Sequence, residues 1–253
     1  DRFQGIRFRL GAAMAMALLP IFVLSLIQTQ ADFQRQADDR QVDLQLAAER
    51  SASSAKAKLD SAQVLLRALS PDAVGPYCAP RLTALVGRLE GYEGLYRISP
   101  TGEAVCASGR VDGVRSGVAP AAQSTWFQRL RNGEELVVMR APDGAGYEGA
   151  LIVATRAERP MGRFDGAMVA VIPFSALQPD VTDAALPSGA QAALTDGAGR
   201  ILTASDPDVF KLSAGDDIAG WVDRARDQGS AVFEAKDAQN QRRDYAGAAL
   251  AGG

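Results

Sequence analysis

The stretch LGAAMAMALLPIFVLSLI runs from Leu10 to Ile27 without a charged residue. At a rise of about 1.5 Å per residue, a helix of this length measures about 27 Å, close to the roughly 30 Å hydrocarbon core of a bilayer. Arginines precede this stretch and charges of both signs follow it, a distribution that favours a cytoplasmic N-terminus. We therefore expect residues 1–9 in the cytoplasm, a transmembrane helix over residues 10–27, and the chain from about residue 28 onward outside the membrane.

Two other interpretations of this stretch stay open. A secretory signal peptide has an apolar region of only about 7–15 residues, although Thr29-Gln30-Ala31 would be an acceptable cleavage site. A buried helix of a globular domain would carry polar residues along one face. Pro20 is compatible with a membrane helix, because other donors there can satisfy the carbonyls that a proline frees. The sequence favours an uncleaved anchor.

The composition excludes several classes of function. The 253 residues carry a net charge of −3 and no basic block of the kind that binds nucleic acid. The absence of histidine removes Ser-His-Asp and Cys-His catalysis, histidine-bearing zinc sites and a phospho-accepting histidine. Adjacent carboxylates such as Glu134 and Glu135 lack a catalytic partner. We expect no catalytic residue, no metal site and no cofactor in this chain, which begins at Asp1 and which we interpret as a piece of a longer protein.

Two cysteines, Cys78 and Cys106, are too few for a structural zinc site. In an oxidising compartment an isolated pair more often forms a disulfide than stays free. Closing the loop between them would stabilise the domain by about 3.5 kcal/mol in the chain-entropy description. Two unrelated buried thiols and a redox-sensing pair are the alternatives.

The segment from Gln28 to Leu69 contains neither glycine nor proline and predicts a stalk helix, residues 28–70, continuous with the apolar run. Forty residues of helix span about 60 Å, longer than one small domain requires. We expect this helix to pack on its own domain and on a second copy of the chain, giving a homodimer. Core packing alone would explain the leucine-rich end equally well. One stripe recurs every three or four positions: Leu44, Ala48, Ser51, Ala55, Leu59, Ala62, Leu66 and Leu69.

A strand–turn–strand pattern occurs twice, over residues 95–107 and again over residues 193–204. The two copies align at an offset of ninety-seven, which places Gly102 on Gly199 and Ser99 on Asp196. We expect two modules, residues 71–185 and residues 186–253, the second without an obvious final strand. The further elements predicted are helices over 80–89, 124–131 (with Ser124 as its cap) and within 206–227, and strands over 135–140, 149–156, 166–174, 231–235 and 243–250.

An anchor, a long helix and two units that each open with a strand–(D/S)xxG–strand hairpin resemble the double Cache (PAS-like) extracytoplasmic domain of bacterial membrane receptors. The resemblance is carried by Ile98-Ser-Pro-Thr-Gly102, by Ser124-Thr-Trp-Phe127 and by Leu194-Thr-Asp-Gly-Ala-Gly-Arg-Ile201. The cysteine positions are similar to those of Cache sensors on histidine kinases of the HWE type and on diguanylate cyclases.

The resemblance implies an α+β fold: a transmembrane helix that continues into the stalk, then two antiparallel-sheet modules, the first distal to the membrane and the second proximal. It implies a receptor of the bacterial inner membrane whose periplasmic part binds a small molecule or a protein signal. The expected whole protein is a sensor histidine kinase. A diguanylate cyclase, a chemoreceptor and a membrane-anchored periplasmic interaction protein without signalling output are the alternatives.

In such a module the ligand site lies on the concave face of the first sheet, beside the helix that carries Trp126. Amino-acid-sensing members have an arginine two residues before a Trp-Tyr pair and an aspartate at the end of the fifth strand. This chain has Ser124 at the arginine position and Phe127 at the tyrosine position, and its Val171-Ile-Pro-Phe174 contains no aspartate. These differences argue against an ordinary amino-acid ligand. Aromatic residues at a helix start also commonly serve as core. The candidate ligand-binding residues are Trp126, Phe127, Arg129, Arg140 and Tyr147.

Overall fold

The computed structural model describes residues 2–70, 75–108, 120–142, 149–178, 186, 189–212 and 217–250. Within the N-terminal helix it describes the side chains of residues 25, 28–29, 32, 35–36 and all those from residue 39 onward. The helices are α1 (Arg2–Leu69), α2 (Cys78–Val86), α3 (Thr125–Arg131), α4 (Phe174–Leu177) and α5 (Ile218–Gln228). The strands are β1 (Gly94–Ile98), β2 (Ala104–Ala107), β3 (Leu136–Arg140), β4 (Ala150–Arg159), β5 (Arg163–Pro173), β6 (Ala193–Thr195), β7 (Ile201–Ala204), β8 (Ser230–Lys236) and β9 (Arg242–Ala248). The chain therefore has the α+β class that the sequence predicts, with one long helix beside antiparallel strands.

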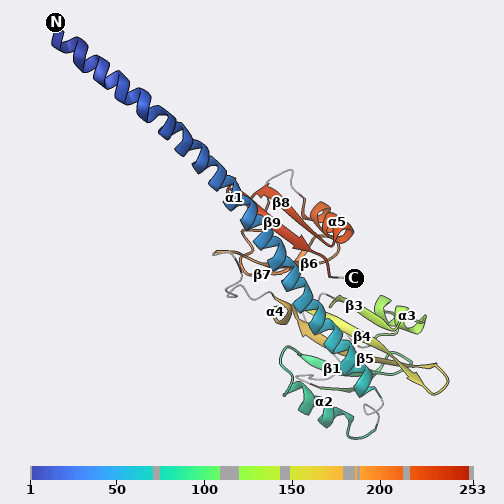
Figure 1. The fold of residues 1–253 in the computed structure, drawn as a ribbon. Helices are drawn as coiled ribbons and strands as arrows, with labels where there is room; N and C mark the ends of the chain where they lie inside the picture. Colours follow the sequence, from blue (N-terminus) through green and yellow to red (C-terminus); the bar gives the residue numbers. More distant parts are fainter. Residues whose placement is uncertain are drawn as a thin grey trace.

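The helix α1 is continuous over 68 residues and ends at Leu69, directly before Ser70-Pro71. Its N-terminal half extends away from the folded body, and its C-terminal half lies along that body (Figure 1). Among the described side chains, no helix is both long and apolar enough to cross a membrane. Most side chains of the apolar run Leu10–Ile27 lie outside the described part of the chain.

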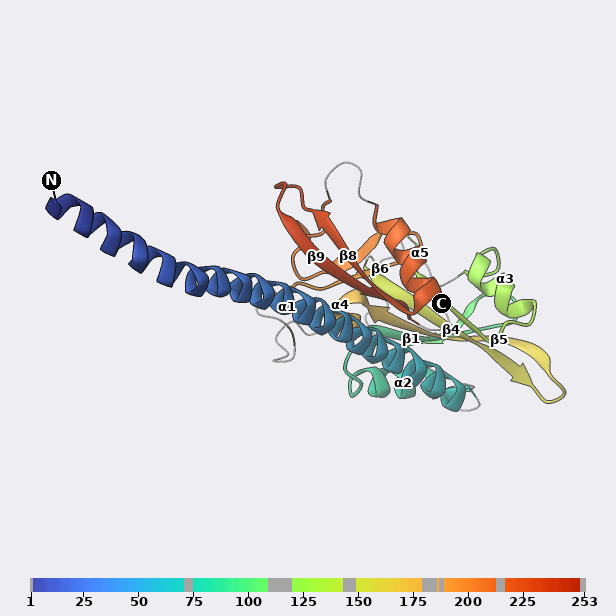
Figure 2. The ribbon, with the colours of Figure 1, turned by 45° about the horizontal axis from the view of Figure 1, so that its top comes forward.

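One face of α1 packs on the strands, as the apolar stripe predicts. No residue of the stripe from Leu44 to Leu69 is exposed, and Ala62 and Leu66 are completely buried. The helix contacts β4 and β5 near its C-terminal end, and it contacts β8 and β9 closer to its middle. Full burial of a leucine side chain contributes roughly 1.5–3 kcal/mol. The same helix therefore supports both groups of strands (Figure 2).

The first group is a five-stranded antiparallel sheet in the order β2-β1-β5-β4-β3. The central strand β5 pairs with β1 along one edge and with β4 along the other. Side chains alternate between the two faces: Leu151 and Val153 of β4 face α1 and α2, whereas Ile152 and Ala154 face α3. A single layer of backbone thus separates two apolar clusters.

The expected disulfide is present. Cys78, the first residue of α2, is bonded to Cys106 of β2, and their Cα atoms are 6.1 Å apart. The bond fastens α2 to the edge strand of the sheet, so that Leu82 of α2 is held in the cluster that also contains Leu66 of α1.

The second group consists of the ladders β6–β7 and β8–β9, with α5 packed on the latter. Its small core contains Phe233 and Tyr245, with Trp221 packed beside them. The Trp221 ring stacks on Phe233 with a centroid distance of 5.0 Å. The Tyr245 hydroxyl donates a 2.9 Å hydrogen bond to the carbonyl of Val209.

The two hairpins aligned by sequence make the same contacts. The Ser108 hydroxyl accepts a 2.8 Å hydrogen bond from the Leu95 amide. The Ser205 hydroxyl accepts one of 2.9 Å from the Ala192 amide, and both of these residues lie ninety-seven positions after their counterparts in the first hairpin. In the first turn the Ser99 hydroxyl accepts a hydrogen bond from the Glu103 amide, and in the second the Asp196 carboxylate accepts one from the Arg200 amide.

The turn glycines are equivalent as well. Gly102 and Gly199 have positive φ angles of 89° and 79°. A Cβ added to Gly102 would lie 2.4 Å from the amide nitrogen of Ala122, and one added to Gly199 would lie 2.6 Å from that of Ala219. Each hairpin therefore needs glycine where the following segment crosses the turn.

Several predicted boundaries and one cap differ from the structure. Helix α2 ends at Val86, with Gly87 as its C-cap, instead of reaching residue 89. The predicted Ser124 cap is wrong, because the Ser124 hydroxyl donates to the carbonyl of Ala121 and caps no amide of α3. Within 206–227 the helix begins only at Ile218, where the Asp217 carboxylate accepts from the Ala219 amide at 2.9 Å.

Replacing Gly199 by alanine should lower the free energy of unfolding by roughly 2–5 kcal/mol, because it combines a positive φ with a backbone clash. The control is Gly162→Ala, at a turn glycine that has a φ of 72° and nothing within 4 Å of the added Cβ. It should cost only about 1–2 kcal/mol. Urea unfolding followed by circular dichroism measures both variants, and equal costs would contradict the close approach of Gly199 to Ala219.

The turn between β8 and β9 is closed by Asp237, whose side chain is fully buried. Its carboxylate accepts hydrogen bonds of 2.9 Å from the Gln239 and Gln241 amides and of 2.6 Å from the Arg243 guanidinium. The Arg243 hydrogen bond is the main reason that the pKa of Asp237 is lowered, although burial opposes it.

A carboxylate with a lowered pKa stabilises the folded state above its ordinary pKa of 3.8, and this stabilisation disappears as the pH falls through the folded-state value. Asp237→Asn should therefore lower the urea midpoint at pH 7, and its difference from the unmodified chain should shrink below about pH 4. Asp223→Asn, at a side chain that is 67% exposed, is the control and should change little at either pH. A difference that is independent of pH would show that the charge of Asp237 contributes nothing.

Candidate ligand-binding site

The helix α3 places three large side chains on the first sheet. Trp126, Phe127 and Leu130 lie on one face of this short helix and are each at most 1% exposed. The rings of Trp126 and Phe127 meet edge to face, with centroids 5.6 Å apart and an interplanar angle of 87°. Phe127 in turn contacts Phe164 of β5, with centroids 5.5 Å apart. The predicted aromatic pair is therefore located on the face of the sheet that the sequence indicates.

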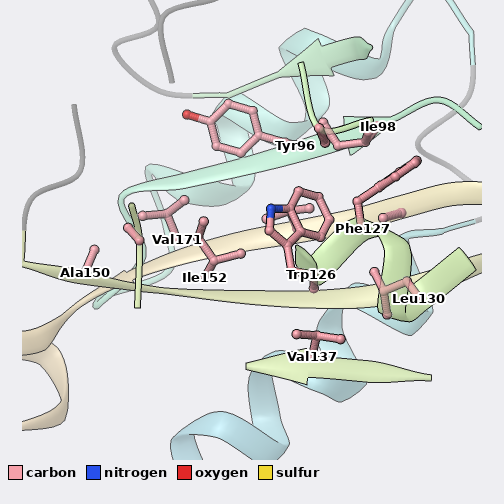
Figure 3. Close-up of a cluster of buried hydrophobic side chains, with 14 residues drawn as sticks. Tyr96, Ile98, Trp126, Phe127, Leu130, Val137, Ala150, Ile152 and Val171 are labelled. Atoms are coloured by element: carbon pink, nitrogen blue, oxygen red, sulfur yellow. The ribbon is translucent and has the colours of Figure 1, made fainter. Parts of the chain in front are cut away.

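The sheet opposite Trp126 is built largely from small side chains. Tyr96 and Ile98 of β1 border this surface, and the aromatic rings of Tyr96 and Trp126 lie on the same side of the sheet (Figure 3). The remaining buried members of this cluster are Ala121, Val137, Ala141, Ala150, Ile152, Ala154, Ala167, Val169 and Val171.

The indole nitrogen of Trp126 is the distinctive polar atom of this cluster. It is buried and has no hydrogen-bond acceptor among the described residues. In Figure 3 the nitrogen is on the side of the ring that is turned toward Tyr96. An unsatisfied buried donor costs about 1–3 kcal/mol. An acceptor atom of a small molecule placed here would remove that cost.

Arg156 of β4 fixes the C-terminal end of α3 to the sheet. Its guanidinium Nη1 donates to the carbonyls of Leu130, at 2.5 Å, and Arg131, at 3.2 Å, at the C-terminal end of α3. Carbonyls in the last turn of a helix have no partner within the helix, and a cation there also complements the helix dipole. The guanidinium carbon lies 4.9 Å from the centroid of the Phe164 ring. Arg156 thus fixes both α3 and a ring that supports Phe127.

The other predicted site residues do not join this cluster. Arg129 is exposed and forms an ion pair with Glu134, with its Nε 2.9 Å from both carboxylate oxygens. Arg140 alternates with Val137 and Met139 of β3, which face Trp126, and is exposed on the other side of that strand. Tyr147 lies outside the described residues. The structure therefore brings together Trp126 and Phe127, and it adds Tyr96 to them.

A buried ion pair lies on the opposite face of the sheet. The Arg97 side chain is 4% exposed, and its Nη2 donates to the Asp165 carboxylate at 2.7 Å. Further bonds reach the carbonyls of Ile98, the last residue of β1, and of Asp165 in β5. Burial lowers the pKa of Arg97, and the Asp165 charge opposes this shift. These contacts fasten β1 to the β4–β5 hairpin, while the buried Arg97 Nε has no hydrogen-bond partner among the described residues.

Sequence reasoning missed Tyr96 and Arg156, although strand alternation carried a signal for both. Tyr96 has the same parity as Ile98 in β1, and Arg156 has the same parity as Ile152 and Ala154 in β4. The side chains of both residues therefore had to lie on the Trp126 side of their strands. Among the described residues, no group of three or more acidic or cysteine side chains is arranged to hold a metal ion.

No protein-family model matches the chain, and no curated protein matches its sequence. Solved structures do share its fold. The extracellular domain of rpHK1S-Z16, which is assigned as a histidine kinase, is 18% identical; the match covers 91% of this chain and 100% of that domain, with a TM-score of 0.63. The sensory domain of the Campylobacter jejuni chemoreceptor Tlp3 (CcmL) is 17% identical, with 85% and 89% covered and a TM-score of 0.58.

The extracellular domain of soHK1S-Z6, also assigned as a histidine kinase, is 16% identical, with 89% of this chain and 93% of that domain covered and a TM-score of 0.58. At these identities the likeness concerns the fold. The chain has the fold of extracellular sensory domains of histidine kinases and chemoreceptors, which confirms the expected α+β fold with a long helix and antiparallel sheet.

Replacing Arg156 by methionine should loosen α3 and expose Trp126, because the last carbonyls of the helix lose their donor. We expect a free energy of unfolding lower by about 1–3 kcal/mol and faster quenching of Trp126 fluorescence by acrylamide. Arg129→Met, which removes only an exposed ion pair on α3 itself, is the control and should change either quantity little. Equal effects of the two substitutions would contradict the positioning role of Arg156.

Proposed function

We propose that this chain is the extracytoplasmic sensory input region of a membrane signal-transduction receptor, with a sensor histidine kinase as the first candidate for the whole protein. The observation that carries the proposal is the fold likeness to the extracellular domain of rpHK1S-Z16, which spans the full length of that domain. An input region needs no catalytic residues of its own, which agrees with a sequence that lacks histidine.

The proposed membrane topology follows from α1. Residues 1–9 lie in the cytoplasm, residues 10–27 cross the inner membrane, and residues 28–70 form a stalk that carries the sensor in the periplasm. The uninterrupted helix from Arg2 to Leu69 supports this arrangement, because it joins the apolar run to the folded body without a hinge. The disulfide between Cys78 and Cys106 agrees with an oxidising compartment.

The sensor is proposed to contain two PAS-like modules, a distal one over residues 71–185 and a proximal one over residues 186–253. The equivalent hydrogen bonds of Ser108 and Ser205 support this division, as do the equivalent turns at Gly102 and Gly199. This is the arrangement named double Cache.

The ligand is proposed to bind in the distal module between α3 and the sheet, where Trp126, Phe127 and Tyr96 lie. A suitable ligand is a small molecule with an apolar body and one hydrogen-bond acceptor for the Trp126 indole N–H. The large share of apolar side chains around Trp126 favours a ligand with an apolar body. Arg129 and Arg140 are exposed and lie away from this cluster, so they are less suited to contact the ligand. Tyr147 lies outside the described residues.

Signal transmission would use the opposite face of the same sheet. Ile152 faces the ligand side, and the next residue, Val153, lies in the cluster that contains Ala62 and Leu66 of α1. A ligand can shift the receptor only if it binds one of two arrangements more tightly. A displacement of β4 on ligand binding would therefore bias the position of α1. In a homodimer, the exposed Val42, Leu46 and Val64 of α1 are available to the second copy.

A chemoreceptor is the second candidate for the whole protein, and the fold likeness to the Tlp3 sensory domain favours it. A diguanylate cyclase, or a periplasmic interaction protein without output, would use the same input fold. The protein sequence that follows Gly253 in the gene separates these possibilities.

The experiment is a thermal-shift screen of residues 28–253 against small metabolites, followed by tryptophan fluorescence titration of each hit. The chain has two tryptophans, so Trp221→Phe leaves Trp126 as the single reporter. Trp126→Phe keeps an aromatic ring but removes the N–H, and should weaken binding roughly 5- to 30-fold, equivalent to one hydrogen bond of about 1–2 kcal/mol. Trp221→Phe is the control and should bind as tightly as the unmodified chain. A hit whose affinity depends on Trp221 and not on Trp126 would overturn the proposed site.

A further inference from the structure

The two sulfur atoms of the Cys78–Cys106 disulfide have different surroundings. Cys78 is the first residue of α2, is 3% exposed, and lines an open cavity of about 420 Å³ at the end of α1. Cys106 is in β2, directly opposite Arg97 of β1, and is not among the residues that line this cavity. One end of the bond therefore borders a cavity, and the other end has a buried cation as its cross-strand neighbour.

The cavity combines an apolar wall with positive charge. The apolar wall is formed by Leu69 of α1 and by Leu82 and Leu85 of α2. The side chains of Arg81 and Arg88 also line it, and both residues are exposed. Neither guanidinium forms an ion pair with another described residue. A small molecule that carries a carboxylate therefore finds two cationic partners beside the Cys78 sulfur.

The position of Arg97 provides a cation for the other sulfur. Directly opposite residues of an antiparallel pair place their side chains on the same face, with Cβ atoms about 4.5–5.5 Å apart. The Arg97 side chain is 4% exposed, and its Nη atoms bond the Asp165 carboxylate and backbone carbonyls. Its buried Nε–H has no acceptor among the described residues. A thiolate at Cys106 would supply that acceptor and would have its negative charge stabilised in return.

We propose that the Cys78–Cys106 disulfide is a thiol-exchange site whose co-substrate is a low-molecular-weight thiol that carries a carboxylate. This thiol loses its proton to solvent and attacks the Cys78 sulfur from the cavity, while Arg81 and Arg88 hold its carboxylate. A bond forms between the incoming sulfur and Cys78, and the Cys78–Cys106 bond breaks. The electron pair of the broken bond goes to the Cys106 sulfur, which leaves as a thiolate beside Arg97. The product is a mixed disulfide on Cys78.

A second molecule of the same thiol completes the reduction. Its thiolate attacks the sulfur of the first molecule, and the electron pair of the mixed disulfide goes to Cys78, which takes a proton from solvent. Two molecules of the thiol are thereby oxidised to their own disulfide, and the two electrons reduce the Cys78–Cys106 bond. The first attack occurs at Cys78 because this sulfur borders the cavity and because a leaving thiolate whose charge is stabilised departs faster.

The exchange changes how α2 is held against α1. The disulfide fastens α2 to the edge strand β2, and Leu82 of α2 shares an apolar cluster with Ala62 and Leu66 of α1. Once the bond opens, α2 keeps only noncovalent contacts with the sheet, so the distal end of α1 loses a covalently fixed neighbour. This inference goes beyond the proposed function, because it concerns the face of the sheet opposite Trp126 and needs no ligand there.

The first experiment determines which cysteine receives the thiol. The whole chain, purified with its disulfide intact, is incubated with reduced glutathione, quenched in acid and mapped by mass spectrometry after proteolysis. We expect the glutathione adduct on Cys78 and a free thiol at Cys106. An adduct mainly on Cys106, or equal amounts on both, would overturn the proposal. So would an absence of reaction in the folded chain under conditions in which the urea-unfolded chain reacts.

The second experiment tests the two arginines of the cavity. Reduced glutathione is compared with 2-mercaptoethanol, which has no carboxylate, at equal thiolate concentration. The double substitution of Arg81→Gln and Arg88→Gln should slow the reaction with glutathione roughly 3- to 10-fold and change that with 2-mercaptoethanol little. Arg163→Gln, at an exposed position of β5, is the matched control and should change neither rate. Equal slowing of both thiols, or of neither, contradicts carboxylate binding at the cavity.

The third experiment separates an effect of Arg97 on the leaving sulfur from a structural effect, because the two have opposite signs. Arg97→Met should slow the exchange roughly 3- to 10-fold, since the Cys106 thiolate loses its cationic neighbour. If Arg97 served the fold alone, its loss would loosen the chain, expose the disulfide and speed the exchange. Arg97→Lys keeps the positive charge and should restore most of the rate. Faster exchange in Arg97→Met, or equal rates in the two variants, would overturn the role of Arg97.

Discussion

Burial of one face of α1 against the five-stranded sheet and the β8–β9 ladder is the interaction on which the rest of the structure depends. The buried positions Ala47, Ala55 and Ala62 are small, which lets the strands lie close to the helix axis, and Leu66 then fills the space at the distal end. The helix is therefore a support common to the five-stranded sheet and the β8–β9 ladder. Any force that the strands exert on these alanines acts on a single helix that continues without a break to Arg2.

The distal sheet is well suited to transmit such a force because its two faces have opposite character. The face toward α1 is fixed by covalent and ionic contacts: the Cys78–Cys106 disulfide holds α2, and Arg97 with Asp165 fastens β1 to the β4–β5 hairpin. On the face toward α3, the described residues fix that helix by Arg156 at its C-terminal end and by the hydrogen bond from the Ala121 amide to the Gly102 carbonyl before its start. Ligand binding would therefore displace α3 more easily than α2.

Local patterns were sufficient to predict most elements of this fold. The long helix, both hairpins and every later strand follow from residue spacing and from glycine at the turns, and the structure has them within a few residues. The Ser124 cap failed because a nearby carbonyl, that of Ala121, competes for its hydroxyl. At the site, spacing predicted Trp126 and Phe127 but not the exposed positions of Arg129 and Arg140. Strand alternation indicates the face on which an arginine such as Arg156 lies, but its contacts with α3 depend on how the helix packs on the sheet, which local spacing does not encode.

The two groups of strands share backbone contacts in their first hairpins and differ in their side chains, and this difference decides where a ligand is to be sought. In the proximal module Trp221 stacks on Phe233, and the Tyr245 hydroxyl is satisfied by the Val209 carbonyl, so its aromatic groups already have their partners. In the distal module small alanines face Trp126, whose indole N–H is buried without an acceptor among the described residues. A folded protein keeps such a donor only where another interaction compensates for it. The shared backbone contacts stabilise both hairpins, and the unsatisfied nitrogen of Trp126 is the reason that the proposed ligand site is placed beside α3.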